Sequence, residues 1–213
     1  MEPIPILLFA KAPVPGQVKT RLLPTLGAEG AAQLAEKLAE ASIVAAGASG
    51  VGPVSLWGMP DCSHPFFARM AESHGVELCR QEGADLGERM DRALGCVLRR
   101  HPAALLAGTD LCRPTPQLFR DAAAILATGT AEATLVPSLD GGYVLIGLRR
   151  RCPELFSGLD WGTGGVCGET LGRMCRLGLS CGLMPVERDL DTPADYAEWM
   201  RHQPEPPGGV RRA

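Results

Sequence analysis

The sequence has 213 residues, 46% of them apolar, which is enough to fill the core of one large domain. The formal net charge of −3 leaves no general basic surface, which argues against nucleic acid as the main partner. The eight cysteines include no C-x-x-C pair and no zinc-like Cys/His spacing, so we expect reduced, mostly buried thiols. We also expect no targeting signal and no membrane span, which predicts a cytoplasmic protein of undetermined oligomeric state.

Predicted strands and helices alternate along the chain. A continuous apolar run predicts a buried first strand over residues 4–9, and helical spacing of Leu and Ala predicts a helix over about residues 29–46. The further predicted elements are a strand at 53–57, a helix at 66–73, a strand at 76–79, a helix over 85–98, a strand at 103–107, a helix over 115–126, and strands at 133–136 and 143–147. This order predicts an α/β fold in which helices flank both faces of a mostly parallel central sheet. We expect one domain over residues 1–202 and a Pro/Gly-rich disordered tail over 203–213.

The loop after the first strand carries the clearest phosphate signal. Lys11, Lys19 and Arg21 lie within eleven residues of an acidic protein, around the flexible Gly16. Glycine permits close approach of the backbone to a ligand, and the cations suit phosphate oxygens. A solvated basic turn is the alternative. We favour a phosphate site.

Asp110 ends the Gly108-Thr109-Asp110 motif at the close of the fourth predicted strand. In open parallel sheets, residues that follow neighbouring strands meet at the carboxyl edge, so we expect Asp110 beside the basic loop. A carboxylate there suits Mg²⁺ or Mn²⁺ shared with a diphosphate. A helix cap or an ordinary loop acid is the alternative.

Asp189 and Asp191 precede a predicted helix and form a second acidic group. Thr192 and Pro193 suit the N-cap and first position of that helix, and Asp195 fits the same start, so these residues have structural reasons to be present. The two earlier aspartates remain available as metal ligands.

Three weaker motifs have structural alternatives. Asp140-Gly141-Gly142 fits a hairpin turn as well as a site. Asp85 fits a helix cap, although that helix start and Arg89 also favour an anion. Residues 161–165 resemble a dinucleotide fingerprint only superficially, because Cys167 replaces the third glycine and no clear strand precedes them.

Taken in order, these motifs resemble the GT-A-type glycosyltransferases associated with arsenosugar biosynthesis, which are related to the molybdenum-cofactor and 2-phospholactate guanylyltransferases. The resemblance covers nearly the whole chain through six blocks: Phe9–Leu22, Gly83–Met90, Gly108–Asp110, Asp140–Tyr143, Trp161–Thr163 and Asp189–Asp195. It departs at Cys112-Arg113, where Pro-Leu is usual, and at Gln17, where Lys is common.

The resemblance implies a Rossmann-like nucleotide-diphospho-sugar transferase fold, a nucleotide held by the N-terminal loop, and Asp110 as a metal ligand, and it strengthens the case for Asp191. We therefore predict metal-dependent glycosyl transfer from a nucleotide-sugar to a small-molecule acceptor, with Mg²⁺ or Mn²⁺ as cofactor. The predicted site comprises catalytic Asp110 and Asp140; phosphate- or nucleotide-binding Lys11, Gly16, Lys19, Arg21, Asp85 and Arg89; acceptor- or sugar-binding Gly141, Gly142, Tyr143 and Trp161; and metal-binding Asp110, Asp189 and Asp191. Nucleotidyl transfer to a phosphorylated small molecule is the alternative activity, and a non-catalytic nucleotide-sensing domain is a third hypothesis.

Overall fold

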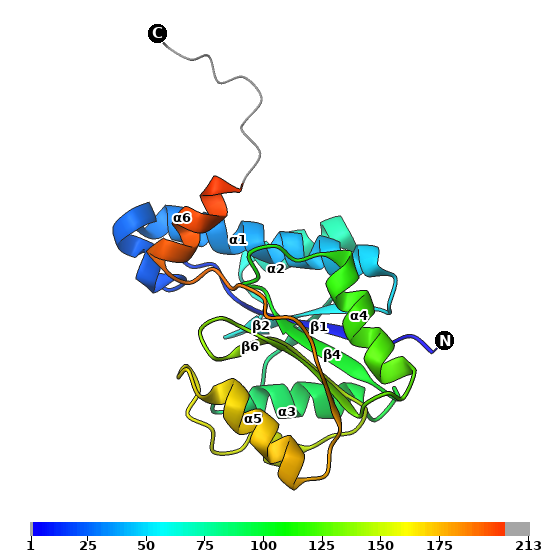
Figure 1. The fold of residues 1–213 in the computed structure, drawn as a ribbon. Helices are drawn as coiled ribbons and strands as arrows, with labels where there is room; N and C mark the ends of the chain where they lie inside the picture. Colours follow the sequence, from blue (N-terminus) through cyan, green and yellow to red (C-terminus); the bar gives the residue numbers. More distant parts are fainter. Residues whose placement is uncertain (1, 203–213) are drawn as a thin grey trace.

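A seven-stranded sheet in the order β3-β2-β1-β4-β6-β5-β7 forms the centre of the molecule (Figure 1). The computed structural model describes residues 2–202. The strands are β1 (Ile6–Lys11), β2 (Val54–Met59), β3 (Glu77–Arg80), β4 (Ala104–Gly108), β5 (Ala133–Pro137), β6 (Tyr143–Leu148) and β7 (Cys181–Leu183). The helices are α1 (Leu23–Ser49), α2 (Pro65–His74), α3 (Leu86–Val97), α4 (Pro116–Ala127), α5 (Val166–Arg176) and α6 (Pro193–Arg201), with short 3₁₀ turns η1 (Thr20–Leu22) and η2 (Pro153–Leu155).

The sheet is mostly parallel, as the alternation of elements predicts. Strand β6 is the exception, because it runs antiparallel to both of its neighbours, β4 and β5. The cause is local: only five residues, 138–142, join β5 to β6. A connection this short allows an antiparallel hairpin, whereas a parallel pair needs a long crossover.

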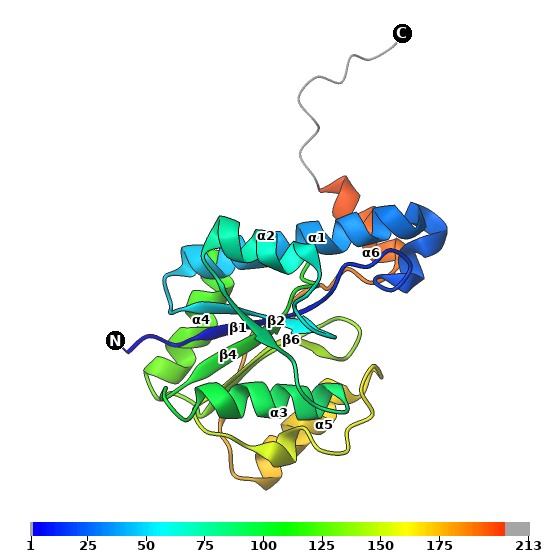
Figure 2. The same cartoon turned by 180° about the vertical axis from the view of Figure 1, so that it is seen from behind.

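Helices cover both faces of the sheet (Figures 1 and 2). Helices α1, α2 and α4 lie on one face, and α3 and α5 lie on the other. Each layer encloses its own apolar cluster. Phe66, Phe67 and Phe119 are fully buried in the first cluster, and Phe156 and Leu94 in the second.

Helix α6 packs beside the start of α1, where Figure 1 shows the two helices crossing. A third, smaller cluster joins them through Leu22, Leu34, Leu38 and the fully buried Leu190. Tyr196 and Trp199 of α6 pack against this cluster. This packing fixes the segment just before α6, which carries Asp189 and Asp191.

The predicted strands and helices are present, with ends that differ by a few residues, except that α1 begins about six residues earlier than predicted. The structure adds α5 and β7, which the sequence patterns do not predict. Helix α5 contains Gly168 and Gly172, which weaken a helix, and β7 is only three residues long. The predicted tail 203–213 lies outside the described residues. None of the described helices is both long and apolar enough to cross a membrane.

One ion pair with a buried carboxylate ties α3 to the segment after β6. Arg151 forms a two-pronged contact with Asp91, and its Nε lies 2.9 Å from Oδ1. Asp91 is 8% exposed, while the Arg151 side chain is 54% exposed. Replacing Arg151 by Ala leaves a buried carboxylate without its partner. We expect the free energy of unfolding to fall by roughly 2–3 kcal/mol, measured by urea denaturation.

The neighbouring Arg150 provides the matched control. Its Nε lies 3.4 Å from Oε1 of Glu132, and about half of each side chain is exposed. Replacing Arg150 by Ala should therefore change the free energy of unfolding by less than about 1 kcal/mol. Equal effects of the two substitutions would show that the Asp91 pair contributes no more than a surface contact.

Candidate functional site

The carboxyl ends of β1 and β4 meet at the centre of the sheet edge. The strands are parallel neighbours, with Phe9 opposite Gly108. Thr109 continues this contact, since its backbone N–H and its hydroxyl both donate to the carbonyl oxygen of Phe9 at 3.2 Å. The basic loop and Asp110 are thereby placed side by side, as expected from the strand order.

The loop after β1 has an unusual backbone at two positions. Gly16 has φ 78°, which glycine adopts freely. Lys19 has φ 47° and ψ 43° and, within residues 2–202, is the only non-glycine residue with positive φ. Such a conformation costs energy in a side-chain-bearing residue and is maintained only where surrounding contacts fix it. Lys11 helps to fix this loop, because its Nζ donates to the carbonyl oxygen of Gln17 at 2.8 Å.

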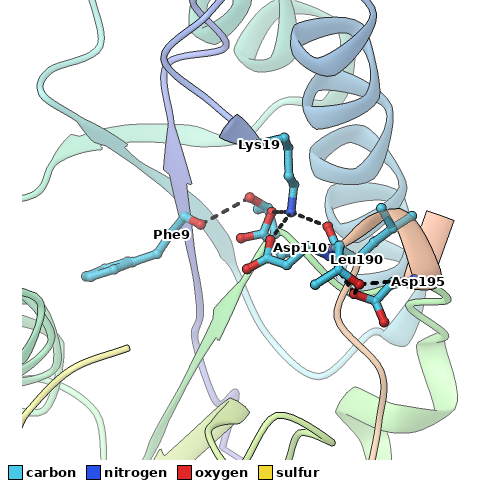
Figure 3. Close-up of polar contacts among 8 residues, drawn as sticks. Phe9, Lys19, Asp110, Leu190 and Asp195 are labelled. Atoms are coloured by element: carbon cyan, nitrogen blue, oxygen red, sulfur yellow. Dashed lines mark hydrogen bonds and ion pairs between the residues drawn. The ribbon is translucent and has the colours of Figure 1, made fainter. Parts of the chain in front are cut away.

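The Lys19 ammonium links the two acidic motifs, as Figure 3 shows. Its Nζ donates to the carbonyl oxygen of Leu190 at 2.7 Å and to Oδ1 of Asp191 at 2.9 Å, and it pairs with Oδ1 of Asp110. The Lys19 side chain is 4% exposed. Burial alone would lower the pKa of Lys19, but the charges of Asp110 and Asp191 outweigh it and raise the pKa above the ordinary value.

Backbone pairing brings the remaining aspartates to the same edge. Leu111 pairs with Asp189, and the N–H of Leu190 donates to the carbonyl oxygen of Asp110 at 2.8 Å. Burial, followed by the negative charge of Asp140, raises the pKa of Asp189 to about 6, with smaller contributions from Asp191 and Asp110. The edge is therefore a region of concentrated negative charge that favours a cation.

The carboxylates fit a divalent metal in their chemistry and direction. One oxygen of Asp110 and one of Asp191 already converge on a single positive atom, Nζ of Lys19. Mg²⁺ and Mn²⁺ take carboxylate oxygens of this kind. Among residues 2–202, however, no three acidic, histidine or cysteine side chains come close enough to form a complete metal cluster. Further ligands would have to come from a substrate or from water.

A cavity of about 210 Å³ opens at this edge. Its polar lining comes from the loop after β1 and from the acidic motifs, and α1 and α2 close its apolar side. The lining includes Lys11, Gln17, Lys19, Thr20, Asp110 and Asp191, together with Ala35, Ala39 and Phe66. Arg21 is exposed just beyond it, in η1.

Two of the predicted helix caps are present in the structure. Thr192 accepts a hydrogen bond from the N–H of Asp195, whose carboxylate accepts in return from the N–H of Thr192 at 2.8 Å. Asp85 likewise caps α3 by accepting from the N–H of Glu88 at 2.8 Å. Arg89 follows on the same helix, and its Nε is buried with no hydrogen-bond partner in residues 2–202.

Asp140 lies in the tight turn between β5 and β6. Its Oδ1 accepts from the hydroxyl of Ser138 and from the N–H of Gly142, the latter at 2.9 Å. The motif therefore forms a hairpin turn, as one of its two interpretations predicts. Asp140 is exposed, and its negative charge acts on Asp189 at the acidic edge. Gly141 has φ 87°, and its carbonyl oxygen accepts from the N–H of Cys167 at 2.9 Å, which joins the turn to the start of α5.

Tyr143 and Trp161 pack against each other on the α3 side of the sheet. Their ring centroids are 6.3 Å apart at an interplanar angle of 77°. The Tyr143 hydroxyl and the Trp161 indole nitrogen are buried and have no hydrogen-bond partner within the described part of the chain. Burial also raises the pKa of Tyr143. These two donors lie away from the cavity lining, on the side of the Asp140 turn.

The sequence patterns do not identify Gln81, which is buried at the same edge. Its Nε2 donates to the carbonyl oxygens of Trp57 at 2.7 Å and Ala10 at 3.2 Å, where β2 and β1 end. Gln81 therefore fixes the ends of these two strands next to the basic loop. A polar residue two positions beyond the end of a predicted strand is the signal that marks it.

The mostly parallel seven-stranded sheet with helices on both faces is an α/β fold that matches the folds of glycosyl and nucleotidyl transferases. A structure of a candidate nucleotide-diphospho-sugar transferase from Desulfovibrio desulfuricans G20 matches with a TM-score of 0.81 and 31% identity, covering 90% of this chain and 84% of the other. A nucleotidyl transferase from Methanothermobacter thermautotroptrophicus matches with a TM-score of 0.59 and 16% identity over 95% and 100% of the two chains. Glucosyl-3-phosphoglycerate synthase from Mycobacterium tuberculosis, in a complex with Mn²⁺, UDP and glucosyl-3-phosphoglycerate, matches with a TM-score of 0.58 and 15% identity over 93% and 76%.

Residues 41–163 match the model of a family described as "Uncharacterized protein conserved in bacteria (DUF2064)", and the chain belongs to this family. No curated protein is similar enough in sequence to match the chain. At the low identities of the second and third structures, the likeness shows the fold alone.

Proposed function

We propose that this protein is a metal-dependent glycosyltransferase that uses a nucleotide-diphospho-sugar as donor. The observation that carries the proposal is the convergence of Asp110 and Asp191 on one cation position, in the lining of a cavity that also includes Lys11. The similarity to the Desulfovibrio protein favours a sugar donor over a nucleoside triphosphate. Mg²⁺ or Mn²⁺ and a cytoplasmic setting belong to the same proposal.

The residues of the site suit the departure of a diphosphate. Lys11 is an exposed cation in the cavity lining, Lys19 is a buried cation in the same lining, and Arg21 is exposed one residue beyond the lining residue Thr20. Cations held in place stabilise the charge that develops on the leaving group without reorganising during the reaction. A divalent metal held by Asp110 and Asp191, with Asp189 nearby, would supply further neutralisation of that charge.

Asp140 and the buried donors around it suit the acceptor side. The acceptor hydroxyl oxygen would bond to the anomeric carbon, while the bond from that carbon to the diphosphate oxygen breaks and its electron pair leaves with the diphosphate. The hydroxyl proton would pass to the exposed carboxylate of Asp140. Gly141 and Gly142 shape this turn, and Tyr143 and Trp161 of the second core cluster are the other candidates for sugar or acceptor contacts. Asp85 and Arg89, at the start of α3, remain candidates for binding the nucleotide.

Product identity distinguishes this activity from nucleotidyl transfer, the alternative that the shared fold supports. Glycosyl transfer releases a nucleoside diphosphate, whereas nucleotidyl transfer releases pyrophosphate and leaves the nucleotide on the acceptor. We expect chromatography of a reaction with Mn²⁺, a panel of nucleotide-sugars and hydroxyl acceptors to show the nucleoside diphosphate. The resemblance to the arsenosugar-associated family makes arsenic-bearing hydroxyl compounds part of that panel.

Two outcomes would reject the proposal. Pyrophosphate release from a nucleoside triphosphate, dependent on a phosphorylated acceptor, would establish the nucleotidyl activity instead. Nucleotide binding without any turnover would favour a sensing domain. A thermal-shift screen of nucleotides and nucleotide-sugars, with and without Mn²⁺, selects the donors to test, because a ligand that binds only the folded state raises stability.

A further inference from the structure

All the hydrogen-bonding capacity of the Lys19 ammonium is used within the protein. An ammonium group has three N–H donors and no acceptor. In the structure, its three acceptors are Oδ1 of Asp110, Oδ1 of Asp191 and the carbonyl oxygen of Leu190. With a side chain only 4% exposed, Lys19 has no donor left for a phosphate oxygen. It can bind a phosphate only by releasing at least one of these partners.

In this geometry, Lys19 and a divalent cation would compete for the same position between Asp110 and Asp191. Asp110 and Asp191 are the two residues that would hold a divalent metal, and each already directs its Oδ1 at Nζ of Lys19. Two positive charges cannot share this position, because their repulsion in a partly buried site is large. Lys19 paired with both carboxylates and a metal held by both carboxylates are therefore alternative states.

A diphosphate would resolve the competition between Lys19 and a metal for the two carboxylates. Its oxygens offer new acceptors to the ammonium, and the cavity beside Nζ is lined by Lys11 and Thr20, where such a group would lie. Lysine carries its charge on a flexible four-carbon stem, so the ammonium can turn from the carboxylates to a phosphate while the backbone of Lys19 stays in place. The carboxylates are then free for the metal.

We propose that Lys19 is a resident counterion of the metal site, so that the divalent cation binds tightly only together with the diphosphate that draws Lys19 away from Asp110 and Asp191. This inference rests on the proposed function, because it takes the metal and the diphosphate as ligands of this site. The coupling is reciprocal: the diphosphate strengthens metal binding by the same factor by which the metal strengthens diphosphate binding.

The test is the affinity of the full chain for Mn²⁺ alone, measured from the EPR signal of the free ion. We expect K19M and K19Q to bind Mn²⁺ about tenfold or more tightly than the wild type, within the range usual for coupled sites. K37M removes the same charge from an exposed position on α1 and should leave the affinity at the wild-type value. Adding D110N to K19M should remove the gain, which would locate the bound ion at this carboxylate.

Wild-type protein gives a second readout that needs no variant. The protons of a buried, fully hydrogen-bonded ammonium exchange slowly with water, so Lys19 should give a separate ¹H–¹⁵N signal. Mg²⁺ alone should leave this signal unchanged, whereas Mg²⁺ with UDP or GDP should shift it.

Two results would overturn the inference: Mn²⁺ affinities of K19M and K19Q no higher than that of the wild type, or a shift of the Lys19 signal by Mg²⁺ alone at low concentration. Either result leaves glycosyl transfer intact if a nucleoside diphosphate is still released. Conversely, tighter Mn²⁺ binding by both variants without any sugar transfer would support the inference and reject the proposed function.

Discussion

Replacing Asp110 by Asn should abolish Mn²⁺-dependent binding of a nucleoside diphosphate while the fold remains intact. The Asn side chain has nearly the shape of Asp but lacks the negative charge that makes a carboxylate the stronger ligand for Mg²⁺ or Mn²⁺. Loss of a direct ligand should cost roughly 100-fold or more in affinity, since removal of a residue that only supports a ligand already costs 10- to 100-fold. Calorimetry with Mn²⁺ and UDP or GDP measures the effect.

The fold should tolerate this change because the Asp110 side chain is 55% exposed, and Lys19 keeps Asp191 and the carbonyl oxygen of Leu190 as partners. Asp121→Asn, which removes a charge from the exposed surface of α4, is the matched control and should leave binding unchanged. Unchanged affinity in the Asp110 variant would remove this residue from the site.

The layered fold could be predicted because the apolar pattern alternates between strand-like and helix-like periods over most of the chain. Helix caps such as Thr192 and Asp85 could also be predicted, because a cap depends only on residues three or four positions away in the sequence. Helix α5 escaped prediction because Gly168 and Gly172 weaken its pattern. It is stabilised by burial of Met174 in the second core cluster, against which Cys167 and Leu171 also pack, and this is a tertiary effect.

The position of the site at the carboxyl edge of the sheet could be predicted from the sequence, but the contacts between its side chains could not. The strand order alone brings Asp110 next to the loop after β1. The pairing of Lys19 with Asp191, however, joins residues 172 positions apart and depends on the left-handed backbone of Lys19. It also depends on the docking of α6 through Leu190. No local pattern encodes these conditions. The sequence therefore predicts Lys19 as an unpaired cation that binds phosphate, whereas in the structure its ammonium is paired with the two aspartates.

Replacing Gly141 by Ala should destabilise the protein and remove activity together. A Cβ atom at this position would lie 2.0 Å from the carbonyl oxygen of Gly164, and the φ of 87° is itself unfavourable for alanine. The backbones must separate, which breaks the hydrogen bond from Cys167 to Gly141 and moves Asp140 away from the acidic edge. Strain of this kind and overpacking each cost about 1–3 kcal/mol.

Gly162→Ala is the control that distinguishes the effect of the steric clash at Gly141 from the effect of the positive φ. Gly162 has the same φ of 87°, but a Cβ atom there would meet nothing within 4 Å. Urea denaturation should therefore show a loss of only about 1 kcal/mol for this control, against a loss of several for the Gly141 variant. Turnover should persist in the control and disappear in the Gly141 variant, because only the latter shifts the turn that holds Asp140. If both variants lose the same stability and keep the same turnover, the contact between the turn and the Gly164 loop has no part in positioning the site.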